Sequence, residues 1–159
     1  PFAIDSKAQV INLSLGGPPD PLLARLIDVA LARGIKVVAA YDRNAPGGGF
    51  PASHGGVIAV DDDSLATTVA GVYSAPGRDV PTTQPGARWS LVDGSSYAAA
   101  HVSGLLALVG EHRTIGPRGT SLVASRSDGE IDACASLLRV SRRNDCACAR
   151  PSRTADVQH

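Results

Sequence analysis

The fold class is decided by residues 8–40, "AQVINLSLGGPPDPLLARLIDVALARGIKVVAA". The first part saturates with Val, Ile and Leu before a double glycine, which is typical of a buried strand. Asp20 followed by Pro21 is a helix-start signal, and apolar residues then recur at helical spacing up to Gly34. A second apolar run, "IKVVAA", completes the segment. Strand, helix and strand in this order predict a right-handed crossover in a parallel sheet, and therefore an α/β fold.

Further elements extend this pattern along the chain. "GVIAV" indicates a third short buried strand, and "TTVAGVYS" and "ARWSLV" indicate two more strands between Pro and Gly turns. A helix is predicted over residues 96–109, after which the periodicity weakens. One more helix is expected over residues 131–140, followed by a frayed tail. We therefore expect a compact unit over residues 1–112 and a weakly patterned extension over residues 113–159.

Composition excludes several classes of partner. Fifteen Lys and Arg balance fifteen Asp and Glu, so no net field favours nucleic acid or an anionic surface. The longest apolar runs fall far short of the roughly 20 residues of a membrane span. Cys134, Cys146 and Cys148 lack the spacing and the partner histidines of a zinc site. We expect a structural or incidental role for these cysteines and predict no cofactor.

Three loops follow predicted strands or precede the predicted helix: "SLGG", "AAYDRN" and "DGSS". In open α/β sheets, sites gather outside the carboxyl ends of the strands. Ser96, at the helix start, would have backbone N–H groups and the helix dipole beside it, as an acyl-transfer nucleophile requires. The alternative is that Ser95 or Ser96 only caps the helix. "VDDDS" stacks three carboxylates, which predicts a solvated turn and not a metal site.

Four ordered segments resemble motifs of the subtilisin-like serine peptidases. They are "VINLSLGG", "VVAA" together with "FPASHGGVIAV", "SAPGRDVPTT", and "GSSYAAAHVSG", the last similar to the family's nucleophile motif G-T-S-M-A-A-P-H-V-S-G. The resemblance covers most of the first 110 residues. It implies a three-layer subtilisin-like parallel sheet with flanking helices, of which this chain would be the C-terminal part, with the N-terminal part missing.

The resemblance implies a serine endopeptidase that hydrolyses a polypeptide substrate through an acyl-enzyme on Ser96, with capping left to Ser95. The family's catalytic Asp and His precede anything that matches Pro1, so the triad would be completed by upstream sequence and the chain alone would have little or no turnover. Family habit also favours a secreted or cell-envelope protein and allows calcium, but these residues indicate neither. The sequence does not indicate an oligomeric state.

The oxyanion donor of the family corresponds to one of three residues in the loop after "VVAA". A one-residue insertion makes Asn44 the donor, a one-residue deletion puts Asp42 there, and a gapless alignment gives Arg43. An ionised Asp would repel the oxyanion and would have to be protonated to donate. We favour Asn44 and keep Asp42 as the alternative.

The same resemblance assigns substrate-binding residues. Ser14, Leu15 and Gly16 match the loop along which an extended substrate would pair as an added strand. Ala39 and Ala40 would line one wall of the pocket for the residue before the cut bond, and Tyr41 would narrow it.

None of the four histidines fits as a substitute for the triad base, since His112 follows the predicted helix and His159 is the last residue. His101 corresponds to a buried family histidine outside the triad, and His54 falls in a turn. The competing interpretations are a non-catalytic subtilisin-like module that keeps the peptide groove, and an α/β-hydrolase esterase, for which "GSSYA" lacks the second glycine.

Finally, a chain without the preceding strands would expose an unpaired edge near "VINLSL", which predicts aggregation or poor stability.

Overall fold

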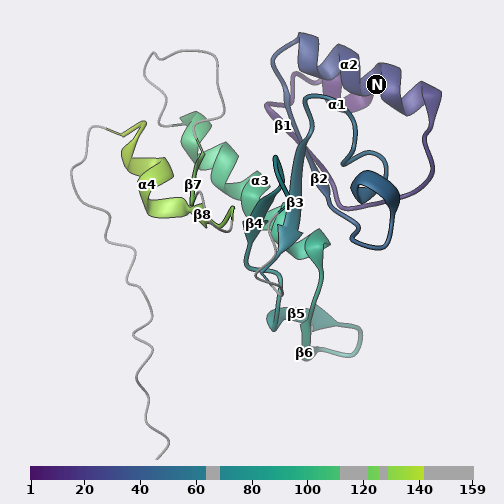
Figure 1. The fold of residues 1–159 in the computed structure, drawn as a ribbon. Helices are drawn as coiled ribbons and strands as arrows, with labels where there is room; N and C mark the ends of the chain where they lie inside the picture. Colours follow the sequence, from purple (N-terminus) through teal and green to yellow (C-terminus); the bar gives the residue numbers. More distant parts are fainter. Residues whose placement is uncertain (64–68, 112–121, 126–128, 142–159) are drawn as a thin grey trace, which may run out of the picture.

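The computed structural model describes residues 1–63, 69–111, 122–125 and 129–141. Its centre is a parallel sheet in the order β1-β2-β3-β4, shown in Figure 1. The strands are β1 (Val10–Leu13), β2 (Lys36–Ala40), β3 (Ile58–Asp62) and β4 (Tyr73–Ala75). The α/β class and the parallel sheet predicted from the sequence are confirmed.

The crossover helix α2 (Pro21–Ala32) begins at the predicted residue. The Asp20 carboxylate accepts a 2.8 Å hydrogen bond from the Leu23 N–H, and Pro21 occupies the first turn, where its missing N–H is no loss. The helix ends before Gly34, which takes φ +79°. Local capping signals therefore set both ends of this helix.

Helices cover both faces of the sheet, as Figure 1 shows, with α1 (Phe2–Asp5) and α2 on one side and α3 (Ser95–Glu111) on the other. Along β2, Val38 and Ala40 join the core cluster beneath α3, whereas Val37 and Ala39 belong to clusters on the opposite face. This alternation follows from the two-residue period of a strand. The expected layers of helix, sheet and helix are therefore present.

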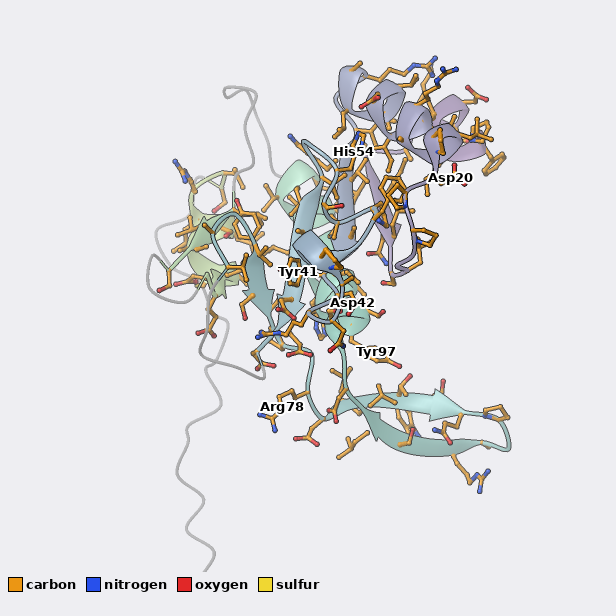
Figure 2. The ribbon with its side chains drawn as sticks, turned by 45° about the vertical axis from the view of Figure 1, so that its right-hand side comes forward. Asp20, Tyr41, Asp42, His54, Arg78 and Tyr97 are labelled. Atoms are coloured by element: carbon orange, nitrogen blue, oxygen red, sulfur yellow. The ribbon has the colours of Figure 1, made fainter. Side chains whose placement is uncertain are left out.

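A hairpin of β5 (Val80–Gln84) and β6 (Arg88–Val92) leads into α3 and projects from the body of the molecule (Figures 1 and 2). Its side chains include the exposed Trp89 and Leu91. The sequence predicted β6 but not β5, because Pro81 lies inside β5 and proline argues against a strand. Pairing in a two-stranded hairpin leaves one edge of each strand free, so proline is tolerated there.

The described part of the C-terminal extension packs against the main core. It consists of β7 (Val123–Ala124), β8 (Ile131–Asp132) and α4 (Ala133–Leu138). The helix is shorter than the expected 131–140, because its first two residues pair with β7 instead. Leu122 and Leu137 join the cluster beneath α3. Cys134 is disulfide-bonded, and the expected frayed tail, with Cys146 and Cys148, lies outside the described residues.

None of the helices in the described ranges is long and apolar enough to cross a membrane.

Candidate active site

The candidate site lies where the loops after β1 and β2 meet the start of α3. Figure 2 labels Tyr41 and Asp42 after β2 and Tyr97 in the first turn of α3, at the same end of the sheet. This is the carboxyl end of the parallel strands, where open α/β sheets place their sites. The three loops singled out from the sequence are therefore brought to one end of the molecule.

Ser96 is the second residue of α3 and is half-buried. The helix begins at Ser95, so Gly94 occupies the cap position, and its carbonyl accepts a 3.0 Å hydrogen bond from the Tyr97 N–H. Among the residues that the structure describes, the Ser95 side chain makes no capping hydrogen bond, because Ser95 is itself the first helical residue. Within the described residues the Ser96 hydroxyl has no hydrogen-bond partner. It lies in the first turn, where backbone N–H groups are not used within the helix.

The backbone of Ser96 is tied to the end of β1. Ser14 Oγ donates a 2.8 Å hydrogen bond to the Ser96 carbonyl, and Asn12 Nδ2 donates to Ser14 Oγ at 3.0 Å. On the other side, Ser103 Oγ lies 3.2 Å from Asn12 Oδ1. Sequence reasoning missed Asn12 and Ser103. The available signal was a polar Asn within an apolar strand, and a serine two helical turns after Ser96, on the same helix face.

The main chain just before Ser96 is held by the turn at Gly77. The Gly94 N–H donates a 2.8 Å hydrogen bond to the Gly77 carbonyl, and the Gly77 N–H donates to Asp63 Oδ1 at 3.2 Å. A Cβ at Gly77 would lie 2.6 Å from Asp62 Cβ and 3.0 Å from the Gly94 carbonyl oxygen. No side chain fits there, so glycine is required for this close approach.

The loop after β2 is held at both ends. The Asp42 N–H donates to the Gly48 carbonyl at 2.9 Å, and Asp42 Oδ1 accepts a 2.9 Å hydrogen bond from the Asn44 N–H. The Tyr41 ring lies over Gly48 in the short turn η1 (Pro46–Gly48), where a Cβ would overlap the ring. The side-chain amide of Asn44 has no partner among the described residues.

Arg43 points to the sheet and pairs with Asp61 of β3, with Arg43 Nε 2.6 Å from Asp61 Oδ2. Burial raises the pKa of Asp61, and the hydrogen bond from Arg43 opposes that effect. The expectation of a solvated turn at "VDDDS" is therefore wrong for its first aspartates: Asp61 and Asp62 belong to β3, and Asp61 is buried in this inner strand, where it pairs with Arg43. Among the described residues, no group of His, Cys, Asp and Glu is arranged to hold a metal ion.

The residues expected to bind substrate divide into two groups. Ser14, Leu15 and Gly16 are exposed in the loop after β1, which then pairs with Phe50 through Gly17 N–H and C=O bonds of 2.9 and 3.3 Å. The other group is Ala39 and Ala40, which are buried in the core, and Tyr41, which is half-buried.

Neither described histidine serves Ser96. His54 Nε2 lies 2.8 Å from Asp28 Oδ1 of α2. His101 Nδ1 lies 2.8 Å from the Pro76 carbonyl oxygen. His101 is exposed, so the expectation that it is buried is wrong; it faces the Pro76 turn and not the sheet. The other two histidines lie outside the described residues.

Curated relatives of this chain are serine proteases. The major intracellular serine protease of Bacillus subtilis is 33% identical over 123 residues, which are 68% of this chain and 39% of that protein. A subtilisin of Bacillus pumilus is 34% identical over 122 residues, 68% of this chain and 44% of the relative. The chain spans about two-fifths of the length of these relatives. No family model matches the chain.

Solved structures show the same fold. A mutant of the protease domain of PatA superposes with a TM-score of 0.71 at 22% identity, over 87% of this chain and 62% of that one. The prenylagaramide maturation protease PagA gives a TM-score of 0.64 at 20% identity, over 88% of this chain and 65% of that one. The arrangement of sheet and helices described above is therefore the one found in these protease domains.

Proposed function

Because this chain belongs to the family of subtilisin-like serine proteases, we propose that it forms the nucleophile-bearing part of a serine endopeptidase. The observation that carries the proposal is the setting of Ser96. Its hydroxyl lies unpartnered among the described residues in the first turn of α3, and its carbonyl is bonded to the Ser14 hydroxyl of the loop after β1. A half-buried serine with a fixed backbone and a free hydroxyl is suited to nucleophilic attack.

The proposed reaction is hydrolysis of a peptide bond in two steps. Ser96 Oγ attacks the carbonyl carbon of the substrate, a histidine takes the hydroxyl proton, and the same histidine gives it to the leaving amine as the C–N bond breaks. Water then hydrolyses the ester on Ser96 by the reverse sequence of proton transfers. An aspartate orients the histidine. We propose that both come from sequence upstream of Pro1, because His54 and His101 are bonded elsewhere.

Two donors are proposed for the oxyanion of the tetrahedral intermediate. One is the backbone N–H of Ser96, in the first turn of α3, and the other is the side-chain amide of Asn44. The loop geometry favours Asn44 over its neighbours. Arg43 is engaged with Asp61, and the Asp42 carboxylate accepts the Asn44 N–H. An ionised Asp42 would also repel the oxyanion.

An extended polypeptide is the proposed substrate, bound along Ser14, Leu15 and Gly16. This stretch is exposed and follows directly from β1, so its backbone is free to pair with a substrate strand. We propose that Tyr41 narrows the pocket for the substrate residue before the cut bond. Tyr41 comes directly after the buried Ala39 and Ala40, and its ring lies against Gly48. A fixed aromatic ring there would restrict the substrate side chain that fits.

The proposal is tested by sequencing upstream of Pro1 and by assaying the full-length protein. An aspartate after a strand and a histidine at a helix start, at family spacing, are expected upstream. Ser96→Ala should then abolish hydrolysis of a peptide substrate, whereas Ser95→Ala, one residue away on the same turn, should retain most of it. Full activity of Ser96→Ala would refute the assignment of the nucleophile.

A non-catalytic peptide-binding module is the second candidate. The observation in its favour is the loop "AYDRN", in which an arginine and an aspartate precede the proposed donor. This candidate predicts that no triad motifs lie upstream. It also predicts that Ser96→Ala leaves peptide binding unchanged and that no hydrolysis is detected.

A further inference from the structure

Arg43 and Asp61 form an ion pair at the base of the loop over residues 41–49. Arg43 Nε lies 2.6 Å from Asp61 Oδ2, and the two side chains are 28% and 8% exposed. Asp61 is part of β3, which is paired on both sides, with β2 and with β4. The ion pair therefore ties a surface loop to the centre of the sheet.

Both oxygens of the Asp61 carboxylate are engaged. Oδ2 faces Arg43, and Oδ1 accepts a 2.8 Å hydrogen bond from the Asp62 N–H. A buried carboxylate that loses its cation is left as an uncompensated charge, which is strongly unfavourable. Arg43 therefore points inward because its guanidinium compensates the buried charge of Asp61.

The remaining loop contacts fix the main chain around Asn44. The Tyr41 N–H donates to the Val60 carbonyl at 2.8 Å, and the Asn44 N–H donates to Asp42 Oδ1 at 2.9 Å. These bonds hold the backbone before and at Asn44, while its side-chain amide has no partner in the described part of the chain. Arg43 lies between these two fixed points, so its direction decides how the next side chain is presented.

We propose that Arg43 is a positioning residue for the reaction: its bond to Asp61 holds the loop so that the Asn44 side-chain amide faces the oxyanion. This inference rests on the role proposed above for Asn44. An oxyanion donor is effective only when it is fixed before the charge develops, and supporting contacts supply that rigidity. The same contact keeps the Arg43 guanidinium away from the reacting carbonyl and occupies it with a carboxylate.

The rigidity of the loop is measured by hydrogen exchange of the Asn44 backbone amide in the full-length protein. The variant combines Arg43→Met with Asp61→Asn, which removes the ion pair without leaving a buried charge, and the carboxamide oxygen introduced by Asp61→Asn can still accept from the Asp62 N–H. We expect exchange at Asn44 to accelerate by roughly tenfold or more, with β2 and β3 unchanged. Asp28→Asn, which alters the bond to His54 on α2, is the control. Unchanged exchange at Asn44 in the double variant would overturn the proposal.

The consequence for the reaction is measured in the full-length protein. Asn44→Ala should lower kcat by about 10²-fold to 10³-fold. Arg43→Met with Asp61→Asn should lower kcat by roughly tenfold or more with little change in KM, because the donor is misplaced but present. Adding Asn44→Ala to that pair should give no further loss beyond Asn44→Ala alone, since both changes act through one amide.

Two kinetic outcomes would overturn the positioning role. If the losses from the ion pair and from Asn44 multiply, Arg43 acts independently of the amide. If Asn44→Ala leaves kcat unchanged while Ser96→Ala abolishes activity, Asn44 is not the donor, and the positioning role is wrong while the serine protease proposal stands.

Discussion

The hydroxyl of Ser14 donates a 2.8 Å hydrogen bond to the backbone carbonyl of Ser96, across 82 positions of sequence. This bond joins the loop proposed to bind substrate to the helix turn that carries the proposed nucleophile. Ser14→Ala removes the hydroxyl that donates to the Ser96 carbonyl and that accepts a hydrogen bond from Asn12 Nδ2. We expect a loss of about 1 kcal/mol in the free energy of unfolding, measured by urea denaturation of the full-length protein.

Ser6→Ala is the matched control, because Ser6 is exposed and its hydroxyl makes no hydrogen bond within the described residues. It should leave the free energy of unfolding unchanged. Equal free energies of unfolding for the Ser14→Ala and Ser6→Ala variants would show that the bond between Ser14 and Ser96 does not contribute to stability.

Gly77→Ala should destabilise the start of α3. The added Cβ would lie 2.6 Å from Asp62 Cβ and 3.0 Å from the Gly94 carbonyl oxygen, so backbone has to move. We expect a loss of about 1–3 kcal/mol in the free energy of unfolding. Gly55→Ala is the control, since its Cβ would meet no atom within 4 Å. A Gly77→Ala protein as stable as the control would contradict the close packing described here.

The pH dependence of stability should carry the signature of Asp61. Burial raises the pKa of Asp61 above its ordinary value, so the folded state keeps this proton to higher pH than the unfolded state does. The contribution of Asp61 to stability therefore falls as the pH rises from about 3.8 through the folded pKa. Relative to Asp61→Asn, the native protein should lose stability over this window in urea denaturation. A relative gain with rising pH would show that Arg43 outweighs burial.

The chain by itself should self-associate through β1. This strand lies at the edge of the four-stranded sheet, and its neighbours among the described strands are on one side only. Unpaired strand edges recruit other chains. Sedimentation velocity should show concentration-dependent association at micromolar concentration. Leu22→Lys, which removes an exposed apolar side chain from α2, should not change it. A monomer that melts in one sharp transition would refute the prediction.

The elements that sequence predicted correctly are those with local causes. Asp20 and Pro21 fix the start of α2 through bonds within one helical turn, and the apolar runs of β2 and β3 reflect burial on both faces of a parallel sheet. The helix that carries Ser96 is likewise predicted by the spacing of its own apolar residues. Periodicity and capping are properties of short segments, so they are visible without the fold.

The contacts that shape the candidate site have no local cause. Asp61 lies buried in the inner strand β3 and is paired with Arg43 from the loop after β2, whereas a row of three aspartates alone predicts exposure. The bond between Ser14 and Ser96 forms because α3 packs on the sheet, which brings its first turn to the end of β1. His101 is exposed, and its Nδ1 contacts the carbonyl oxygen of Pro76, which is distant in sequence. Tertiary pairing, which single-sequence patterns do not encode, decides these positions.

The central claim, that Ser96 is the nucleophile, is tested most directly by covalent labelling of the full-length protein. A fluorophosphonate reacts with serines activated by a neighbouring base, and mass spectrometry of the digest locates the modified residue. The account predicts one label on Ser96, lost in Ser96→Ala and retained in Ser95→Ala. A label on Ser95 or on another residue, or no label while peptide hydrolysis proceeds, would contradict it.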